Sequence, residues 1–468
     1  MSLSLSYRLR PEVEVQQAGK TLWLFCPLAG NNLMGWNSRR PQPLLDALRS
    51  QWLKQAQMAA LFASAPDAAS EALFQLFFMR LVAARLLDLR VRQDGRDVFT
   101  VSPAPDESLL APQPTAGSSW RLNRFAYLRA QDRGLILESP LTPHRLVLHH
   151  PDLTPLVHSL ASVAEVPTTG QGASALLALM LRLGMAEADT QDQDDGPMAF
   201  WEFHDLLFHT RSLGGRHVYP VGASYRFQGQ RPSLPLIKQA SGGEVVDLPR
   251  PSGEIVARME TPLSRVLESR RSLREFDPRP MTLQELGAFL HASARVQKTI
   301  RDQRREDDLS LRPHAGGGAR HPLEIYPLVR ACQGLEAGAY HYDPLRHALE
   351  RVPGEPALLK ELLAQNPHIL EGPQPPQVSL CVAARIGRTA WKYQSIAYKV
   401  INQDLGCLYQ TFYMTATALG LAPCAIGSLD ASLTSEALGV DWREEPFVGL
   451  FTLGCPPGQP ANAKGDAR

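Results

Sequence analysis

The fold is decided by the stretch Arg385-Ile-Gly-Arg-Thr-Ala-Trp-Lys-Tyr-Gln-Ser-Ile-Ala-Tyr398. It joins a strand-like run, Val378–Ala383, to a long apolar segment that ends at Gly420. Apolar residues recur in this segment at steps of three or four, and no proline interrupts it. This spacing predicts a helix with one continuously buried face. A glycine followed three residues later by a proline is a typical helix stop.

Lys392 and Tyr393 stand at the entrance of this predicted helix. Both side chains ordinarily have a pKa near 10, so either one needs a lowered pKa to act as a base near neutrality. Desolvation of the lysine, or a lysine and tyrosine sharing one proton, provides such a shift. The pair is therefore a candidate for acid/base chemistry. A lysine in solvent beside a packed tyrosine remains the alternative interpretation.

Length and composition predict a soluble protein of two or three domains. The chain has 468 residues, 44% hydrophobic residues, 20% charged residues and a formal net charge of +1. A nearly neutral chain favours neither a nucleic acid nor a membrane surface as partner. The most apolar window, residues 72–89, contains two arginines and an aspartate, which predicts a packed helix. The first 14 residues lack the pattern of a signal peptide, so we expect a cytoplasmic protein.

The six cysteines are scattered along the chain. None of them forms a Cys-x-x-Cys or Cys/His pattern with metal-ligand spacing. The sequence therefore predicts neither a disulfide framework nor a metal site.

The amino-terminal half predicts two α+β modules. Residues 5–28 alternate in polarity around the turn Gln17–Lys20, and helical periodicity follows in two segments before a hairpin centred on Asp94 and Gly95. This order suggests a winged-helix-like module over residues 1–110. A similar order of strands and then helices suggests a second such module over residues 115–225.

The carboxy-terminal half predicts one larger α+β domain. Residues 226–260 are rich in proline, glycine and serine, which is typical of a linker or an arm. Helices interleaved with mostly antiparallel strands follow over residues 261–458. Thr282 with Glu285 predicts a capping box at one helix start, and the charged segment 298–308 predicts a loop. We expect the last residues, 459–468, to form a disordered tail.

Three further patterns are candidates for ligand binding. Arg270-Arg271-Ser272-Leu273-Arg274 crowds guanidiniums that suit an anion such as phosphate, and a basic helix end is the alternative. Gly316-Gly317-Gly318 lets backbone approach a flat ligand, although a surface loop fits equally. Ala425–Asp430 follows the helix stop and offers a possible backbone cradle or an ordinary turn.

In this order, the pieces resemble the FMN-dependent nitroreductase superfamily. The resemblance rests on Arg270–Phe276 as the opening flavin motif, on His314–Tyr326 as the glycine loop and its strand, and on Ala418–Gly427 as the later helix and turn. Within this superfamily, the chain resembles the SagB-type azoline dehydrogenases in residues Trp391, Lys392, Tyr393, Asp404, Gly406 and Gln410. The run Trp201–Arg211 is similar to the segment before the oxidase domain in the longer, cyanobactin-oxidase-like members.

The resemblance implies the cofactor and the site. FMN would be bound by residues of the three patterns and of the central helix: Arg270, Arg271, Ser272, Arg274, Ala315, Gly316, Gly317, Gln410, Ile426, Gly427 and Ser428. Lys392 and Tyr393 would be the catalytic pair that removes a ring proton from a thiazoline or oxazoline while hydride passes to the flavin. The product would be the aromatic thiazole or oxazole.

The resemblance also implies partners. They would be a heterocyclised precursor peptide with its leader, possible contact with a cyclodehydratase, and a second copy of the chain with FMN at the shared interface. The winged-helix-like modules would bind the leader or serve a purely structural role. The open alternatives are an NAD(P)H-dependent nitro or quinone reductase, an oxidase for a heterocycle held on a carrier protein, and a scaffold that presents the peptide to another enzyme.

Overall fold

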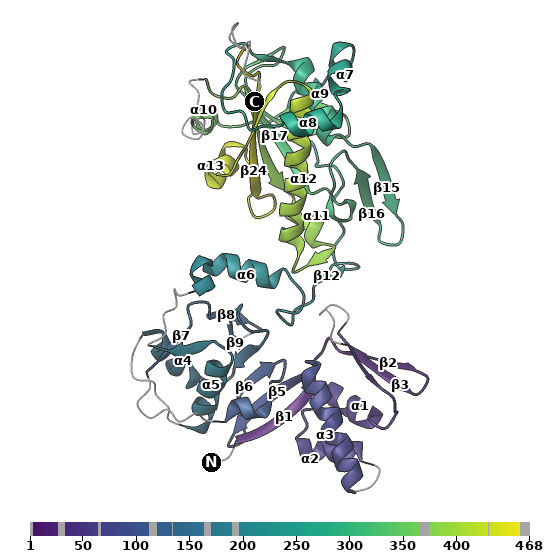
Figure 1. Ribbon diagram of the computed structural model, residues 1–468, viewed down its shortest axis with the longest axis vertical. Helices are drawn as coiled ribbons and strands as arrows, with labels where there is room; N and C mark the ends of the chain where they lie inside the picture. The colour runs from purple at the N-terminus through teal and green to yellow at the C-terminus, as the bar shows by residue number, and fades with distance from the viewer. Residues whose placement is uncertain are drawn as a thin grey trace. The chain divides into compact units, whose positions relative to one another are not determined.

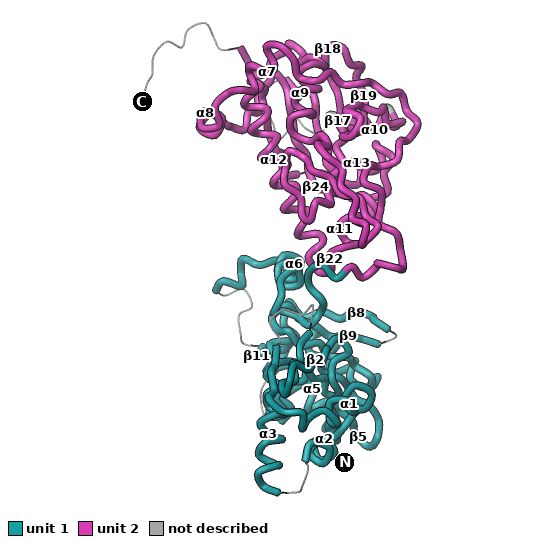
Figure 2. The backbone as a smooth tube through the Cα atoms, turned by 90° about the vertical axis from the view of Figure 1, so that its right-hand side faces the viewer, with its two compact units in different colours: residues 1–224 teal, residues 225–468 magenta. Residues whose placement is uncertain are grey.

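The computed structural model describes residues 3–26, 33–63, 67–111, 119–132, 134–162, 170–189, 196–364, 374–428 and 430–458. The chain divides into two compact units, Met1–Ser224 and Tyr225–Arg468, which Figure 2 colours separately. Each unit has strands and helices of its own, so the predicted α+β class is confirmed. The predicted tail, 459–468, lies outside the described residues.

Unit 1 is built on a six-stranded antiparallel sheet. Its strand order is β1-β5-β6-β10-β9-β8. The strands are β1 (Leu3–Leu9), β5 (Leu87–Gln93), β6 (Arg96–Ser102), β10 (Arg145–Leu148), β9 (Gly134–Glu138) and β8 (Tyr127–Gln131). The sheet takes strands from both segments that the sequence predicted as modules. Their winged-helix character stays a prediction.

The other elements of unit 1 are a smaller sheet, short strands and helices. A three-stranded sheet, β2-β3-β4, contains the predicted hairpin at the turn before Thr21. The bounds are β2 (Glu14–Ala18), β3 (Thr21–Phe25), β4 (Leu33–Trp36), α1 (Gln42–Ser50), α2 (Gln55–Phe62), α3 (Ala68–Ala83), η1 (Glu107–Leu110), β7 (Trp120–Leu122), α4 (Leu153–Ser162), α5 (Gln171–Arg182), β11 (Ala186–Ala188), η2 (Gly196–Phe200), α6 (Phe203–Arg211) and β12 (Gly222–Ala223).

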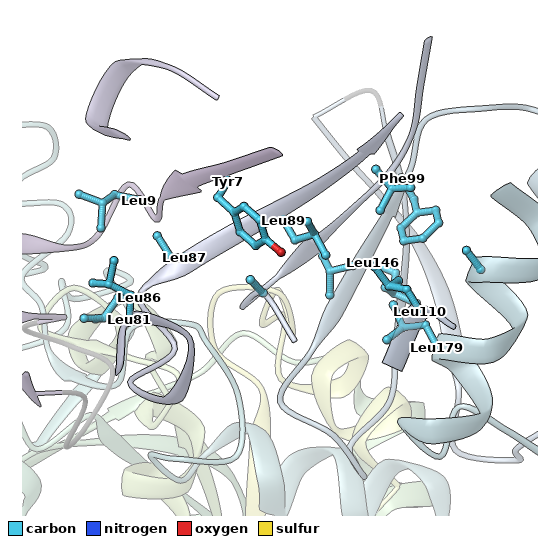
Figure 3. Close-up of a cluster of buried hydrophobic side chains, with 14 of the residues drawn as sticks. Tyr7, Leu9, Leu81, Leu86, Leu87, Leu89, Phe99, Leu110, Leu146 and Leu179 are labelled. Atoms are coloured by element: carbon cyan, nitrogen blue, oxygen red, sulfur yellow. The ribbon is translucent and has the colours of Figure 1, made fainter. Parts of the chain in front are cut away.

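One hydrophobic core runs across unit 1. Figure 3 shows side chains from strands β1, β5, β6 and β10 together with Leu81 of α3 and Leu179 of α5. Tyr7, Leu89 and Phe99 are completely buried there. Alternate residues of each strand face this core, because successive side chains of a strand point to opposite faces.

Unit 2 is built on a seven-stranded sheet with the order β13-β20-β19-β17-β21-β24-β23. All its pairings are antiparallel, as predicted. The strands are β13 (Val245–Asp247), β20 (Ala348–Arg351), β19 (Gly338–Asp343), β17 (Leu323–Val329), β21 (Val378–Ala384), β24 (Phe447–Gly454) and β23 (Ala422–Ile426). The predicted arm, 226–260, lies in unit 2 and contributes the edge strand β13.

The central helix α12 (Ala397–Ala418) lies along this sheet, as Figure 1 shows. Phe412 of α12 packs between Phe289 of α9 (Leu283–Ala294) and Phe451 of β24, at 5.1 Å between ring centroids on either side. The predicted capping box of Thr282 and Glu285 is present at the start of α9. The predicted helix and its buried face are therefore confirmed.

The remaining elements of unit 2 are short. Their bounds are α7 (Glu254–Met259), α8 (Leu263–Ser269), β14 (Met281–Thr282), β15 (Lys298–Asp302), β16 (Asp307–Leu311), η3 (Gly317–Ala319), β18 (Cys332–Gln333), α10 (Pro356–Ala364), α11 (Ile386–Ala390), β22 (Tyr393–Gln394) and α13 (Ala431–Ala437). None of the helices in the described part of the chain could cross a membrane, given their length and polarity.

The charged segment 298–308 corrects one prediction. It forms an antiparallel ribbon of β15 and β16, whereas the sequence predicted a loop. Its strands include Thr299 and Ile300, residues that favour extended backbone, and Glu306 takes the turn with a φ of +51°. The density of charges hid this alternation, because residues 298–301 of β15 are all exposed and the buried residues of β16, Asp307 and Ser310, are polar.

Candidate functional site

The glycine loop lies directly against the Lys392–Tyr393 pair. Gly318 has a φ of +62°, a conformation that side chains other than glycine rarely adopt. A Cβ at this position would meet the Lys392 ammonium and would lie 2.5 Å from the Tyr393 hydroxyl. Two patterns that are about 75 residues apart in sequence, which were predicted separately, therefore form one site.

Asp404 of α12 holds the same loop. The Gly317 amide donates a hydrogen bond of 2.8 Å to Oδ1 of Asp404. The carboxylate is 5% exposed, and its Oδ2 has no hydrogen-bond partner among the described residues. Burial raises the pKa of Asp404 to about 6, although the Gly317 amide acts to lower it. A Cβ at Gly317 would collide with Val400, so only glycine fits this close approach to the helix.

The surroundings of Tyr393 keep its hydroxyl protonated. Burial raises the pKa of Tyr393, the charge of Asp404 raises it further, and Arg320 partly offsets this. Tyr393 is therefore a neutral phenol near pH 7. The Lys392 Nζ lies 5.0 Å from the centroid of the Tyr393 ring and 5.9 Å from that of Tyr225. Two aromatic rings and the glycine loop thus surround the lysine tip.

Two buried arginines connect the glycine loop to α11, the helix that precedes Lys392 and Tyr393. Arg320 and Arg388 are fully buried and flank Asp307, with which Arg320 forms an ion pair. Arg320 donates to the Arg388 carbonyl at 2.7 Å, and Arg388 donates to the Arg320 carbonyl at 2.8 Å. Burial lowers the pKa of Arg388 to about 9 and that of Arg320 to about 10. Both remain charged near neutrality and join the glycine loop to α11.

The segment before β13 forms hydrogen bonds with the residues that precede Lys392. Arg385 donates to the Pro235 carbonyl at 2.9 Å, and Arg388 donates to the Leu234 carbonyl at 2.7 Å. The indole of Trp391 donates to the Arg231 carbonyl at 2.8 Å. We call residues 225–238 the strap. The carbonyls of the strap accept hydrogen bonds from Arg385, Arg388 and Trp391, which directly precede Lys392.

A second cluster joins the arginine pattern to the turn after β23. Ser272 Oγ lies 2.8 Å from the hydroxyl of Tyr413, and this hydroxyl accepts a hydrogen bond of 2.8 Å from the Ala425 amide. The Leu273 amide donates to the Pro423 carbonyl at 2.8 Å, and the Arg270 guanidinium lies over the Tyr413 ring. These contacts bring two predicted binding patterns together around one tyrosine.

The other predicted binding residues lie near these clusters with different exposure. Arg271, Arg274, Ala315, Gln410, Gly427 and Ser428 are exposed, Gly316 is half-buried, and Ile426 is buried. A Cβ added at Gly427 would meet nothing within 4 Å, so the turn has open space beside it. Asp404 and Tyr413 lie nine positions apart on α12, roughly 14 Å along its axis. The two clusters thus lie at separate positions along the same helix.

Sequence reasoning missed several residues of the site. Tyr413 follows Gln410 by three positions, so helical spacing places both side by side and provides the signal that could have found it. Tyr225 and Arg320 carry no local signal of this kind. Within the described residues, no group of three or more His, Cys, Asp or Glu could hold a metal ion.

The Trp201–Arg211 run has a structural role in unit 1. Arg211 of α6 donates to Glu138 of β9 at 2.7 Å, and Arg129 donates to the same carboxylate at 2.7 Å. His204 and His209 of this run are exposed within unit 1, because the helix turns Leu206 and Thr210 inward.

Two family models match the chain. The nitroreductase family matches residues 267–455, and the cyanobactin oxidase ThcOx family matches residues 120–218. A "Putative nitroreductase" of Methanocaldococcus jannaschii is 31% identical over 189 residues, which cover 40% of this chain and 89% of that protein. The chain therefore belongs to the nitroreductase family, a class of oxidoreductases. The resemblance seen in the sequence is confirmed.

Two further relatives are named as processing proteins. The trifolitoxin-processing protein TfxB of Rhizobium leguminosarum bv. trifolii is 29% identical over 140 residues, covering 29% of this chain and 38% of that protein. The microcin B17-processing protein McbC of Escherichia coli is 26% identical over 148 residues, covering 30% of this chain. This chain spans about half of the length of McbC, at 53%.

Solved structures give distant matches. The E. coli microcin synthetase McbBCD complex with truncated pro-MccB17 bound has a TM-score of 0.33 and 21% identity, covering 50% of this chain and 87% of the matched chain. The crystal structure of a "putative nitroreductase" from Anabaena variabilis has a TM-score of 0.39 and 15% identity, covering 97% of this chain and 80% of that one.

Proposed function

We propose that the protein is an FMN-dependent azoline dehydrogenase that converts thiazoline or oxazoline rings of a ribosomally made peptide into thiazoles or oxazoles. The observation that carries the proposal is the contact of Lys392 and Tyr393 with the glycine loop of a nitroreductase domain. The match of residues 120–218 to the cyanobactin oxidase family and the two peptide-processing relatives support the substrate class.

The residues present fit FMN. Arg270 and Ser272, gathered on Tyr413, would hold the phosphate end, and the exposed Arg271 and Arg274 add positive charge. The glycine loop and the turn at Ile426–Ser428 offer backbone that a flat ring can approach, and Gln410 lies between them on α12. When bound, FMN supplies the acceptor for a hydride.

Lys392 and Tyr393 have separate roles in removing the ring proton of the substrate. The Lys392 amine, once it has given up its own proton, accepts the acidic proton of the azoline ring. The neutral phenol of Tyr393 donates a hydrogen bond to the substrate and fixes its orientation beside the glycine loop. Each ring loses two hydrogens in total, one as this proton and one as hydride, and becomes aromatic.

Further parts of the proposal concern partners. Unit 1 would bind the leader of the precursor peptide through winged-helix-like modules, and a cyclodehydratase would supply the azoline. One face of α12 exposes Tyr398, Asn402, Gly406, Cys407 and Gln410, which is the surface expected if a second copy packs there with FMN between the two. The names of the peptide-processing relatives support the peptide partner.

A first experiment tests the cofactor and the chemistry together. The purified full chain should be yellow and release FMN on denaturation, and it should remove two hydrogens from a synthetic peptide that carries one thiazoline, as measured by mass spectrometry. Lys392→Ala and Tyr393→Phe should keep FMN and lose at least about 100-fold in rate. Lys360→Ala, on the exposed face of α10, is the control. Full activity in both site variants would remove the pair from the mechanism.

The second candidate is an NAD(P)H-dependent nitro or quinone reductase. The relative that favours it is the archaeal protein, because this chain covers 89% of it. Rapid oxidation of NADPH in the presence of a nitroarene or quinone, with no change in the thiazoline peptide, would establish this function instead. Turnover of a thiazoline attached to a carrier protein, but not of the free peptide, would redirect the substrate assignment.

A further inference from the structure

Tyr225 lies at the start of the strap and in direct contact with the catalytic pair. Its amide donates a hydrogen bond of 3.1 Å to the carbonyl of Lys392. Its ring meets the ring of Trp391 edge to face, with 5.8 Å between centroids and 84° between planes. Tyr225 has a φ of +49°, so the backbone departs from the usual regions to make these contacts.

The ring of Tyr225 lies among cations. The Arg305 guanidinium, from the turn of the β15–β16 ribbon, lies 4.4 Å from its centroid, and the Lys392 ammonium lies 5.9 Å from it. Such cation–π contacts within about 6 Å stabilise exposed pairs by about 0.5–1 kcal/mol, or roughly 2–5-fold in an equilibrium. The Tyr393 ring covers another side of the same ammonium at 5.0 Å.

Several contacts hold the tyrosine in place. The Gln228 amide donates to the Tyr225 carbonyl at 2.9 Å and closes a turn of the strap. Asp302 accepts from Arg305 at 3.0 Å and so orients the guanidinium over the ring. The Arg231 carbonyl fixes Trp391, against which the Tyr225 ring packs. Strap and ribbon therefore brace the tyrosine from separate parts of the chain.

We propose that Tyr225 is a positioning residue of the reaction site, which keeps the Lys392 amine directed at the glycine loop. This inference rests on the proposed function for its catalytic consequence, but the positioning itself is independent of it. Tyr225 precedes the residues 267–455 that match the nitroreductase family. The reaction site of this chain thus includes a part that the shared family region does not contain.

The first test measures the reactivity of Lys392 without any substrate. The apoprotein is acetylated with a limiting N-hydroxysuccinimide ester, and each lysine is quantified by peptide mass spectrometry relative to the exposed Lys20. Tyr225→Leu should accelerate acetylation of Lys392 about 2–5-fold, whereas Tyr225→Phe, which keeps the ring, should match the wild type. Equal labelling in the leucine variant and the wild type would overturn the proposal.

The second test measures turnover of the thiazoline peptide by the FMN-loaded full chain. Tyr225→Leu should lower kcat at least about 10-fold, with KM and FMN content within about twofold, because a misplaced group costs rate more than binding. Tyr225→Phe should restore most of kcat, and Trp442→Leu, a change at an exposed aromatic residue, should be neutral. If Tyr225→Leu instead raises KM and lowers the FMN content as strongly as it lowers kcat, Tyr225 has a structural role, and the positioning proposal is contradicted.

The two tests separate the possible failures. A wild type that leaves the thiazoline unchanged refutes the proposed function, while the acetylation result still decides whether Tyr225 positions Lys392. Should Tyr225→Leu fail to fold, as judged by its Tm, Arg305→Gln removes the guanidinium on the other side of the ring. This variant should also raise Lys392 acetylation, and an unchanged rate would count against the bracing of Tyr225.

Discussion

The main-chain amide of Gly317 donates a hydrogen bond to the carboxylate of Asp404, 87 positions further along the chain. This bond fixes the glycine loop to the middle of the central helix, on the side where Lys392 and Tyr393 approach Gly318. A carboxylate with one bonded oxygen and one unpartnered buried oxygen is costly. The hydrogen bond from Gly317 offsets part of this cost and holds the glycine loop against the helix.

Replacement of Asp404 should loosen the glycine loop when the new side chain cannot accept the hydrogen bond from Gly317. Asp404→Ala leaves the Gly317 amide without its partner, at a cost of about 1–3 kcal/mol. Asp404→Asn keeps a carbonyl oxygen that can accept the bond. Hydrogen exchange of the peptide that contains Gly317 should therefore be faster in the alanine variant and near wild type in the asparagine variant. Equal exchange in all three proteins would contradict this role.

The raised pKa of Asp404 predicts a pH dependence of stability. A carboxyl with a pKa of about 6 when folded and 3.8 when unfolded binds protons better in the native state. The contribution of Asp404 to the free energy of unfolding is fully present below about pH 4. It is lost as the pH rises through 6, by about 3 kcal/mol in total. Urea unfolding of the apoprotein should show the wild type losing this much relative to Asp404→Asn between pH 4 and 7. Parallel profiles would refute the shift.

Gly318→Ala should displace Lys392 and Tyr393. The added Cβ meets the tips of Lys392 and Tyr393, and its backbone is left-handed, which costs about 1–2 kcal/mol for a residue other than glycine. We expect a folded protein with at least about 10-fold lower turnover of the thiazoline peptide. Gly439→Ala is the matched control, since its φ is also +62° but its Cβ meets nothing within 4 Å. Similar losses in both variants would assign the effect to backbone strain alone.

Glu138→Gln should destabilise unit 1. Burial acts to raise the pKa of Glu138, but Arg211, Tyr219 and Arg129 together lower it, so the carboxylate is charged. Removal of this charge leaves two partly exposed guanidiniums without their anionic partner, and the loss of such a charged hydrogen-bond partner costs about 1.5–3 kcal/mol. Calorimetry should show a lower Tm for unit 1. Glu71→Gln, on the exposed face of α3, should leave that transition unchanged, and an unchanged Tm in Glu138→Gln would contradict the role of the cluster.

The sequence by itself determined the elements whose signals are local. The steps of three and four after Lys392 predicted α12, the Thr282–Glu285 spacing predicted the start of α9, and the strand-like run Val378–Ala383 predicted β21. The family membership followed from short patterns in the right order. Each of these signals lies within about 20 residues, which is the range over which periodicity and capping act.

Only the tertiary structure decided which of these patterns meet. The contacts of Gly317 with Asp404, of Ser272 with Tyr413 and of Tyr225 with Lys392 join residues that no local spacing relates. The same holds for the direction of each pKa shift, because burial and neighbouring charges come from packing. Residue type and local pattern fix what a side chain is able to do, and the folded chain fixes which partner it finds and how much water remains around it.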